Sequence, residues 1–148
     1  MVVVKPMVIL SIAGSLVWNI ATAEVLYKVI APALTGVTLF DQQLDETGLV
    51  TIKPTVLEAK GDAFVMDQCL WSINVDLDAD LPTFSAGKMI CVGPNQEVLE
   101  SVPLGEIEAF GDCVDAKCSS LKVAGDQKVN MILADDLEFS LQPRNERK

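Results

Sequence analysis

The first 23 residues constrain this chain more than any other segment, because they predict export. Lys5 supplies a positive charge, and an apolar run of 14 residues follows from Met7 to Ile20. Residues 21–23 (Ala-Thr-Ala) then give the small-x-small pattern that signal peptidase accepts before Glu24. Cysteines oxidise outside the cytoplasm, so the rest of the chain is expected to fold with disulfide bonds.

The same segment also fits an uncleaved membrane anchor. A helix needs about 20 apolar residues to span a bilayer. The helical spacing of apolar residues continues past Glu24, which stands at the favourable i, i+4 spacing from Lys28. We expect residues 1–23 to be a signal peptide. A retained helix over residues 6–31 is the alternative, and only this alternative places the protein on a membrane.

Residues 24–148 are expected to form one domain, since the sequence contains no repeat or linker. Its clearest pattern runs from Cys69 to Asp78, where apolar and polar residues alternate with the period of a strand that buries one face. Similar short segments follow one another between turn residues, which predicts an all-β Greek-key sandwich or barrel of short antiparallel strands. The other expected strands cover residues 37–40, 49–52, 56–60, 63–67, 88–92, 97–102, 104–110, 119–123, 128–133 and 137–141, with an irregular connection over 81–87.

The four cysteines allow three disulfide pairings. Cys113 and Cys118 flank four residues, and a hairpin around that loop would place them opposite each other on adjacent strands. Cys69 and Cys91 lie on expected buried strand faces and form the remaining pair. The loop then serves either as a stapled hairpin or as a rigid recognition surface, and its residues are Val114, Asp115, Ala116 and Lys117.

Charge and composition argue against several classes of function. The net charge of −10 disfavours binding to nucleic acid and to anionic lipid, because both need basic residues to neutralise phosphate. The chain has no histidine, which excludes Ser-His-Asp and Cys-His catalysis and His-ligated zinc. It also has no CxxC motif. We therefore expect no cofactor and no enzymatic activity.

Two groups of carboxylates resemble functional sites in part. Asp76, Asp78 and Asp80 match the start of a calcium-binding loop, because calcium takes several oxygen ligands. The glycine and glutamate that such a loop needs further along are replaced by Leu81 and Gly87. Another pair, Glu106 and Glu108, lies on one face of an expected strand. Such a pair serves in glycosidases, but the chain has too few aromatic residues to wall a sugar cleft.

These observations predict a non-catalytic, exported structural or adaptor subunit of a cell-envelope or extracellular assembly. It would bind protein partners, or copies of itself, through β surfaces. One alternative is a soluble secreted binding protein or inhibitor that uses the Cys113–Cys118 loop. Another is a calcium-binding β domain. The expected location is periplasmic or extracellular, with membrane attachment if the leader is retained.

Overall fold

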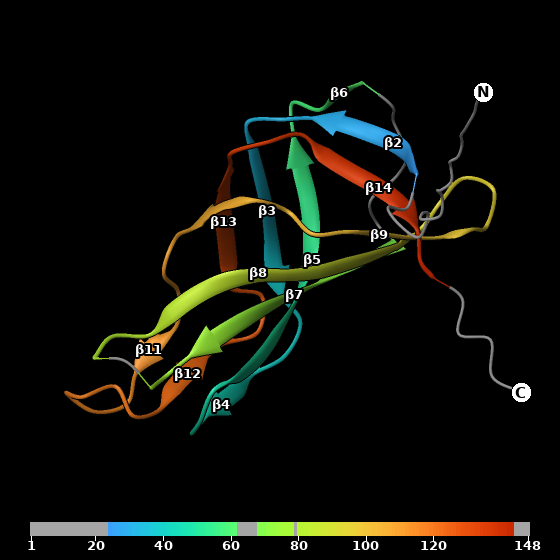
Figure 1. Ribbon diagram of the computed structural model, residues 1–148. Coiled ribbons are helices and arrows are strands. Elements are labelled where there is room, and N and C mark those ends of the chain that lie inside the picture. The colour runs from blue at the N-terminus through green and yellow to red at the C-terminus, as the bar shows by residue number, and fades with distance from the viewer. Residues whose placement is uncertain (1–23, 62–67, 79, 144–148) are drawn as a thin grey trace, which may run out of the picture.

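The computed structural model describes residues 24–61, 68–78 and 80–143, which form antiparallel β-sheets without an α-helix (Figure 1). The all-β expectation is confirmed. A ten-stranded sheet contains, in spatial order, β10 (Gly105–Ile107), β13 (Lys128–Leu133), β3 (Ala33–Thr38), β5 (Gly48–Leu57), β7 (Cys69–Asp76), β8 (Thr83–Val92), β9 (Val98–Ser101), β14 (Leu137–Leu141), β2 (Val25–Ile30) and β6 (Lys60–Gly61). A three-stranded sheet contains β11 (Asp112–Cys113), β12 (Leu121–Val123) and β4 (Gln42–Leu44). The part of the chain described here includes no helix suited to crossing a membrane.

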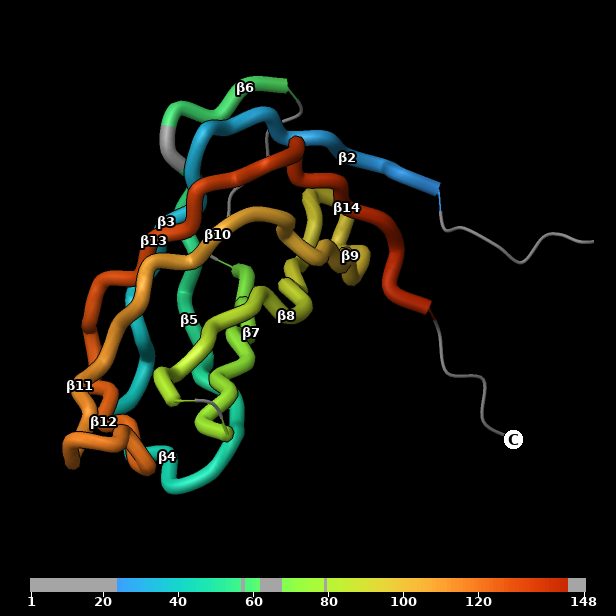
Figure 2. The backbone as a smooth tube through the Cα atoms, turned by 60° about the vertical axis from the view of Figure 1, so that its left-hand side comes forward, coloured from blue at the N-terminus to red at the C-terminus, as the bar shows by residue number. Residues whose placement is uncertain are grey.

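The ten-stranded sheet folds back on itself at a corner (Figures 1 and 2). β3, β5 and β13 are neighbours in one half of the sheet, while their chain continuations β2, β6 and β14 belong to the other half. The chain bends between the members of each pair, at Pro32 between β2 and β3, and at Glu58, whose φ is 51°, between β5 and β6. Strands that bend from one layer into another in this way let one sheet enclose a core.

The core is centred on β7 and confirms the strand expected there. Cys69, Trp71, Ile73 and Val75 are at most 1% exposed, while the residues between them face away from the core. Trp71 lies opposite Ile52 of β5 and Met89 of β8, both fully buried. The period of two therefore supplies a buried face in the middle of the sheet.

Thr38, at the end of β3, joins the ten-stranded sheet to the small sheet. Its hydroxyl donates a hydrogen bond to the Ala124 carbonyl and accepts one from the Gln127 amide at 2.9 Å. Its own amide and carbonyl bond to Gln127 and Asp126 at 3.0 and 2.9 Å. Since Thr38 is 1% exposed, these bonds fix the turn between β12 and β13 against the end of β3.

Two expectations about local structure need correction, and two more lie outside the described residues. The helix continuing to residue 31 is wrong, because residues 25–30 form β2 and pair with β14. The irregular connection over residues 81–87 is also wrong from Thr83 onward, since β8 starts there opposite Asp76 and extends the ladder of β7. Long-range pairing overrides weak local patterns in both places. The leader (1–23) and the strand expected over residues 63–67 lie outside the described residues.

Candidate functional site

Two disulfide bonds are present, as expected, and they join the pairs that the spacing predicts. Cys69 and Cys91 lie directly opposite each other on β7 and β8, with a Cα–Cα distance of 4.1 Å, and each is 1% exposed. Cys113 and Cys118 are joined with a Cα–Cα distance of 4.7 Å. The first bond belongs to the core, whereas the second lies beside the exposed loop.

The loop closed by Cys113–Cys118 differs from the simple hairpin expected. Cys113 of β11 lies opposite Leu121 of β12, not opposite Cys118. Cys118 lies within the loop, with a positive φ of 54°, and its amide donates to the Asp115 carbonyl at 3.1 Å. The disulfide therefore crosses the inside of a wider loop, over residues 114–120.

Asp115 holds this loop in one conformation. Its Oδ1 accepts a hydrogen bond from the Ser119 amide at 3.0 Å, and its Oδ2 accepts one from the Ser119 hydroxyl at 2.6 Å. The hydrogen bonds from Ser119 lower the pKa of Asp115, because they favour the charged carboxylate. All four residues between the cysteines, Val114, Asp115, Ala116 and Lys117, are exposed.

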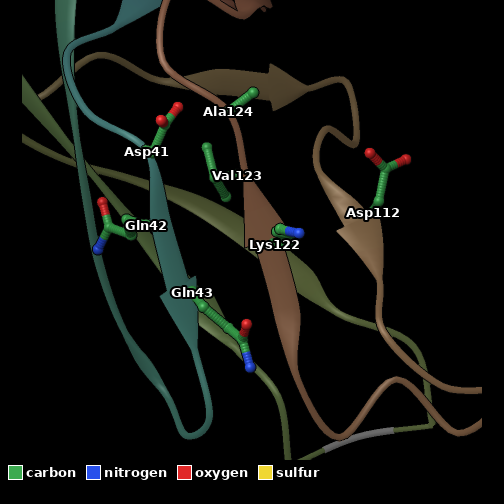
Figure 3. Close-up of a pocket in the computed structure, with 7 residues that line it drawn as sticks. All are labelled: Asp41, Gln42, Gln43, Asp112, Lys122, Val123 and Ala124. Atoms are coloured by element: carbon green, nitrogen blue, oxygen red, sulfur yellow. The ribbon is translucent and has the colours of Figure 1, made fainter.

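A hollow of about 580 Å³ lies over the small sheet (Figure 3). Asp112, Lys122 and Gln43 are directly opposite one another on β11, β12 and β4, so they form one row across the exposed face. The residues that line the hollow are Asp41, Gln42, Gln43, Asp112, Lys122, Val123 and Ala124.

Two carboxylates order the polar groups around this hollow. Asp45 Oδ1 accepts hydrogen bonds from Gln43 Nε2 at 3.0 Å and from the Ser120 hydroxyl at 2.7 Å. The bond from Ser120, and then that from Gln43, lower the pKa of Asp45. Asp41 Oδ1 accepts a bond from the Gly125 amide at 2.7 Å. These hydrogen bonds hold Gln43 and Asp41 in place at the margin of the hollow.

The aspartates suggested as a calcium site serve the turn after β7. Asp76 Oδ1 accepts hydrogen bonds from the Thr47 hydroxyl at 3.2 Å and from the Asp78 amide at 2.8 Å, while Asp78 and Asp80 are exposed. Within the described residues, no three Asp, Glu, Cys or His side chains lie close enough to hold a metal ion. Calcium binding at Asp76, Asp78 and Asp80 stays a prediction.

Glu106 and Glu108 lie at one edge of the large sheet. Both are exposed, Glu106 on the edge strand β10 and Glu108 just after it. Glu108 Oε1 accepts a hydrogen bond from Asn130 Nδ2 at 3.3 Å.

A second hollow lies at the corner of the large sheet and includes an ion pair between Lys28 and Glu138 at 3.7 Å. It is lined by Lys28, Val102, Leu104, Asp135, Asp136 and Glu138.

Sequence reasoning missed the hollow over the small sheet. The sequence predicts no strand between residues 40 and 49, although Gln42–Leu44 form β4. The row of Asp112, Lys122 and Gln43 depends on the pairing of Lys122 with Gln43, which lie about 80 positions apart in the chain. Such pairings leave no local pattern, so only the spacing of Cys113 and Cys118 pointed to this region.

No protein-family model matches this sequence, and no curated protein matches it.

Proposed function

We propose that this protein is a non-catalytic, exported structural or adaptor subunit of a cell-envelope or extracellular assembly. It binds partner proteins through its distal end, which consists of β4, β11, β12 and residues 114–120. Two disulfide bonds support a periplasmic or extracellular location, because such bonds persist where thiols are oxidised. The ten-stranded sheet folds back on itself, and three pairs of consecutive strands, β2–β3, β5–β6 and β13–β14, pass from one half to the other. This arrangement supports assignment to the Greek-key sandwich or barrel class.

The position of the distal end carries this proposal. The start of β2 and the end of β14 are neighbours, since Val25 lies opposite Ser140. The small sheet lies at the other end of the molecule in both views (Figures 1 and 2). A protein attached to a larger assembly near its chain ends would therefore present its distal end outward. Exposed loops on a rigid scaffold are the usual place for recognition.

Three carboxylates accept hydrogen bonds that hold loops and turns in place. These hydrogen bonds lower the pKa of Asp45, Glu97 and Asp115. Their hydrogen bonds fix loops, and ordered loops lose less entropy when a partner binds.

Purification from the source under mild detergent tests this function. We expect the exported chain to elute in a stoichiometric complex, with the mass of the complex measured by light scattering. Lys117→Trp on the distal end should weaken the complex, because the bulky side chain obstructs the contact. The matched control is Lys60→Trp on β6, which lies at the opposite end of the molecule (Figure 1). A monomer in native extracts, or equal effects of the two variants, contradicts the proposal.

A second candidate is a soluble secreted inhibitor that inserts the Cys113–Cys118 loop into a partner's cleft. The favouring observation is the double hydrogen bond between Asp115 and Ser119, which holds an exposed loop in one shape. A panel of secreted proteases checks it. Stoichiometric inhibition that is lost on reduction of the loop disulfide supports this candidate, and full protease activity with excess protein removes it.

A further inference from the structure

We propose that the hollow over the small sheet binds a basic segment of a partner protein, with an arginine or lysine side chain seated between β4 and β11. The inference rests on the proposed function and specifies the chemistry of the partner. A volume of about 580 Å³ is ample for one such side chain and the main chain beside it. Known ligand sites enclose roughly 300–1,000 Å³.

The hollow offers more hydrogen-bond acceptors than donors. One N–H of Gln43 Nε2 is bonded to Asp45, and the amide oxygen of Gln43 stays available as an acceptor. Asp41 uses Oδ1 for the Gly125 amide and retains its second oxygen. The side chain of Asp112 makes no hydrogen bond or ion pair with any other described residue. A guanidinium group, with five donors and no acceptor, complements such a lining.

Among the described residues, Lys122 is the one basic residue that lines this hollow. It lies directly opposite Asp112, yet the two side chains form no ion pair within the described part of the protein. Figure 3 shows its side chain between those of Gln43 and Asp112. A cationic guest must therefore share Asp112 with Lys122, which makes Lys122 a negative determinant of affinity. Removing the charge of Lys122 should therefore tighten the binding of a cationic guest.

The charge of the whole protein favours a cationic guest as well. The net charge is −10, and Asp45 adds a carboxylate at the margin of the hollow through its bond to Gln43. A long-range negative potential attracts basic segments and speeds their association. It also means that any cationic peptide gains some binding from charge alone. The test must separate the hollow from this general attraction.

Fluorescence anisotropy with a labelled tetra-arginine peptide and the full oxidised chain provides that test. Asp112→Asn should weaken binding roughly threefold, and Lys122→Gln should tighten it by a similar factor, as expected for exposed charge pairs. The matched control is Asp136→Asn, an exposed carboxylate of the second hollow. It should change the dissociation constant by less than either variant. Because Lys122→Gln predicts a gain, misfolding cannot imitate the expected result.

Other outcomes would overturn the inference. Equal weakening by Asp112→Asn and Asp136→Asn would mean that only overall charge attracts the peptide. Tighter binding of tetra-glutamate, lost in Lys122→Gln, would make the hollow an anion site. The proposed function is tested separately by the native complex: a complex that tolerates both hollow variants refutes this inference alone. Peptide binding with the expected signs, in a protein that is always monomeric, refutes the proposed function alone.

Discussion

In the ten-stranded sheet the interior is filled by large apolar side chains, whereas the distal end adds fewer buried residues to the same core and is also held by hydrogen bonds and a disulfide. Trp71, Ile52 and Met89 form one fully buried row in the large sheet. In the small sheet only β12 contributes fully buried apolar residues, Leu121 and Val123. The large sheet is therefore stabilised by the packing of buried apolar side chains. The distal end depends in addition on a few hydrogen bonds and a disulfide.

The largest expected effect comes from the centre of the scaffold. Trp71→Ala should lower the free energy of unfolding by about 3–5 kcal/mol, because it removes a fully buried indole and leaves a cavity. Trp71→Phe should cost much less, since the indole Nε1 has no hydrogen-bond partner among the described residues. Urea unfolding followed by circular dichroism measures both. If the two variants lower the free energy of unfolding equally, the indole nitrogen of Trp71 must make a hydrogen bond that stabilises the core.

The two disulfides provide the next comparison. Replacing both Cys69 and Cys91 by alanine should cost about 3 kcal/mol, and the same change at Cys113 and Cys118 about 2 kcal/mol, because the second bond closes a shorter loop. Limited reduction of the folded protein should open Cys113–Cys118 first, since Cys113 is exposed and the other bond is buried. Alkylation followed by peptide mass mapping decides the order. Reduction of Cys69–Cys91 before Cys113–Cys118 would mean that burial in the core does not protect the first bond.

The same contrast explains how far the sequence predicts this structure. Alternation over Cys69–Asp76 is a local signal, and it predicted both the strand and its buried face. The corner was not predictable in this way, because residues 25–30 carry apolar residues at a spacing that also suits a helix. Only pairing with β14 makes this segment a strand. The hollow was missed for a related reason, since its row joins Gln43 to Lys122 through long-range pairing.

A smaller effect is expected where the two regions meet. Thr38→Val keeps the volume but removes the hydroxyl that bonds to Ala124 and Gln127. The Ala124 carbonyl and the Gln127 amide are only partly buried, so losing the two hydrogen bonds should cost about 1–2 kcal/mol. Hydrogen exchange should accelerate at residues 125–127 and remain slow in β7. The control is Thr35→Val, whose hydroxyl makes one exposed bond to Thr55 at 3.3 Å. Faster hydrogen exchange throughout the protein, including β7, would show that Thr38 stabilises the whole fold and not only the junction.

The smallest effect concerns the pH dependence of the loop over residues 114–120. The pKa of Asp115 is lowered from its ordinary value of 3.8, chiefly by the Ser119 hydroxyl. A carboxyl group whose pKa is lower in the folded state stabilises that state above its unfolded pKa, and this contribution disappears as the pH falls through the folded value. The Ser119 amide resonance should therefore shift with a midpoint below pH 3.8, while the resonances of β7 stay unchanged. In Asp115→Asn this titration should vanish. A Ser119 shift that persists in the variant, or one centred above pH 3.8, would mean that another group controls the loop.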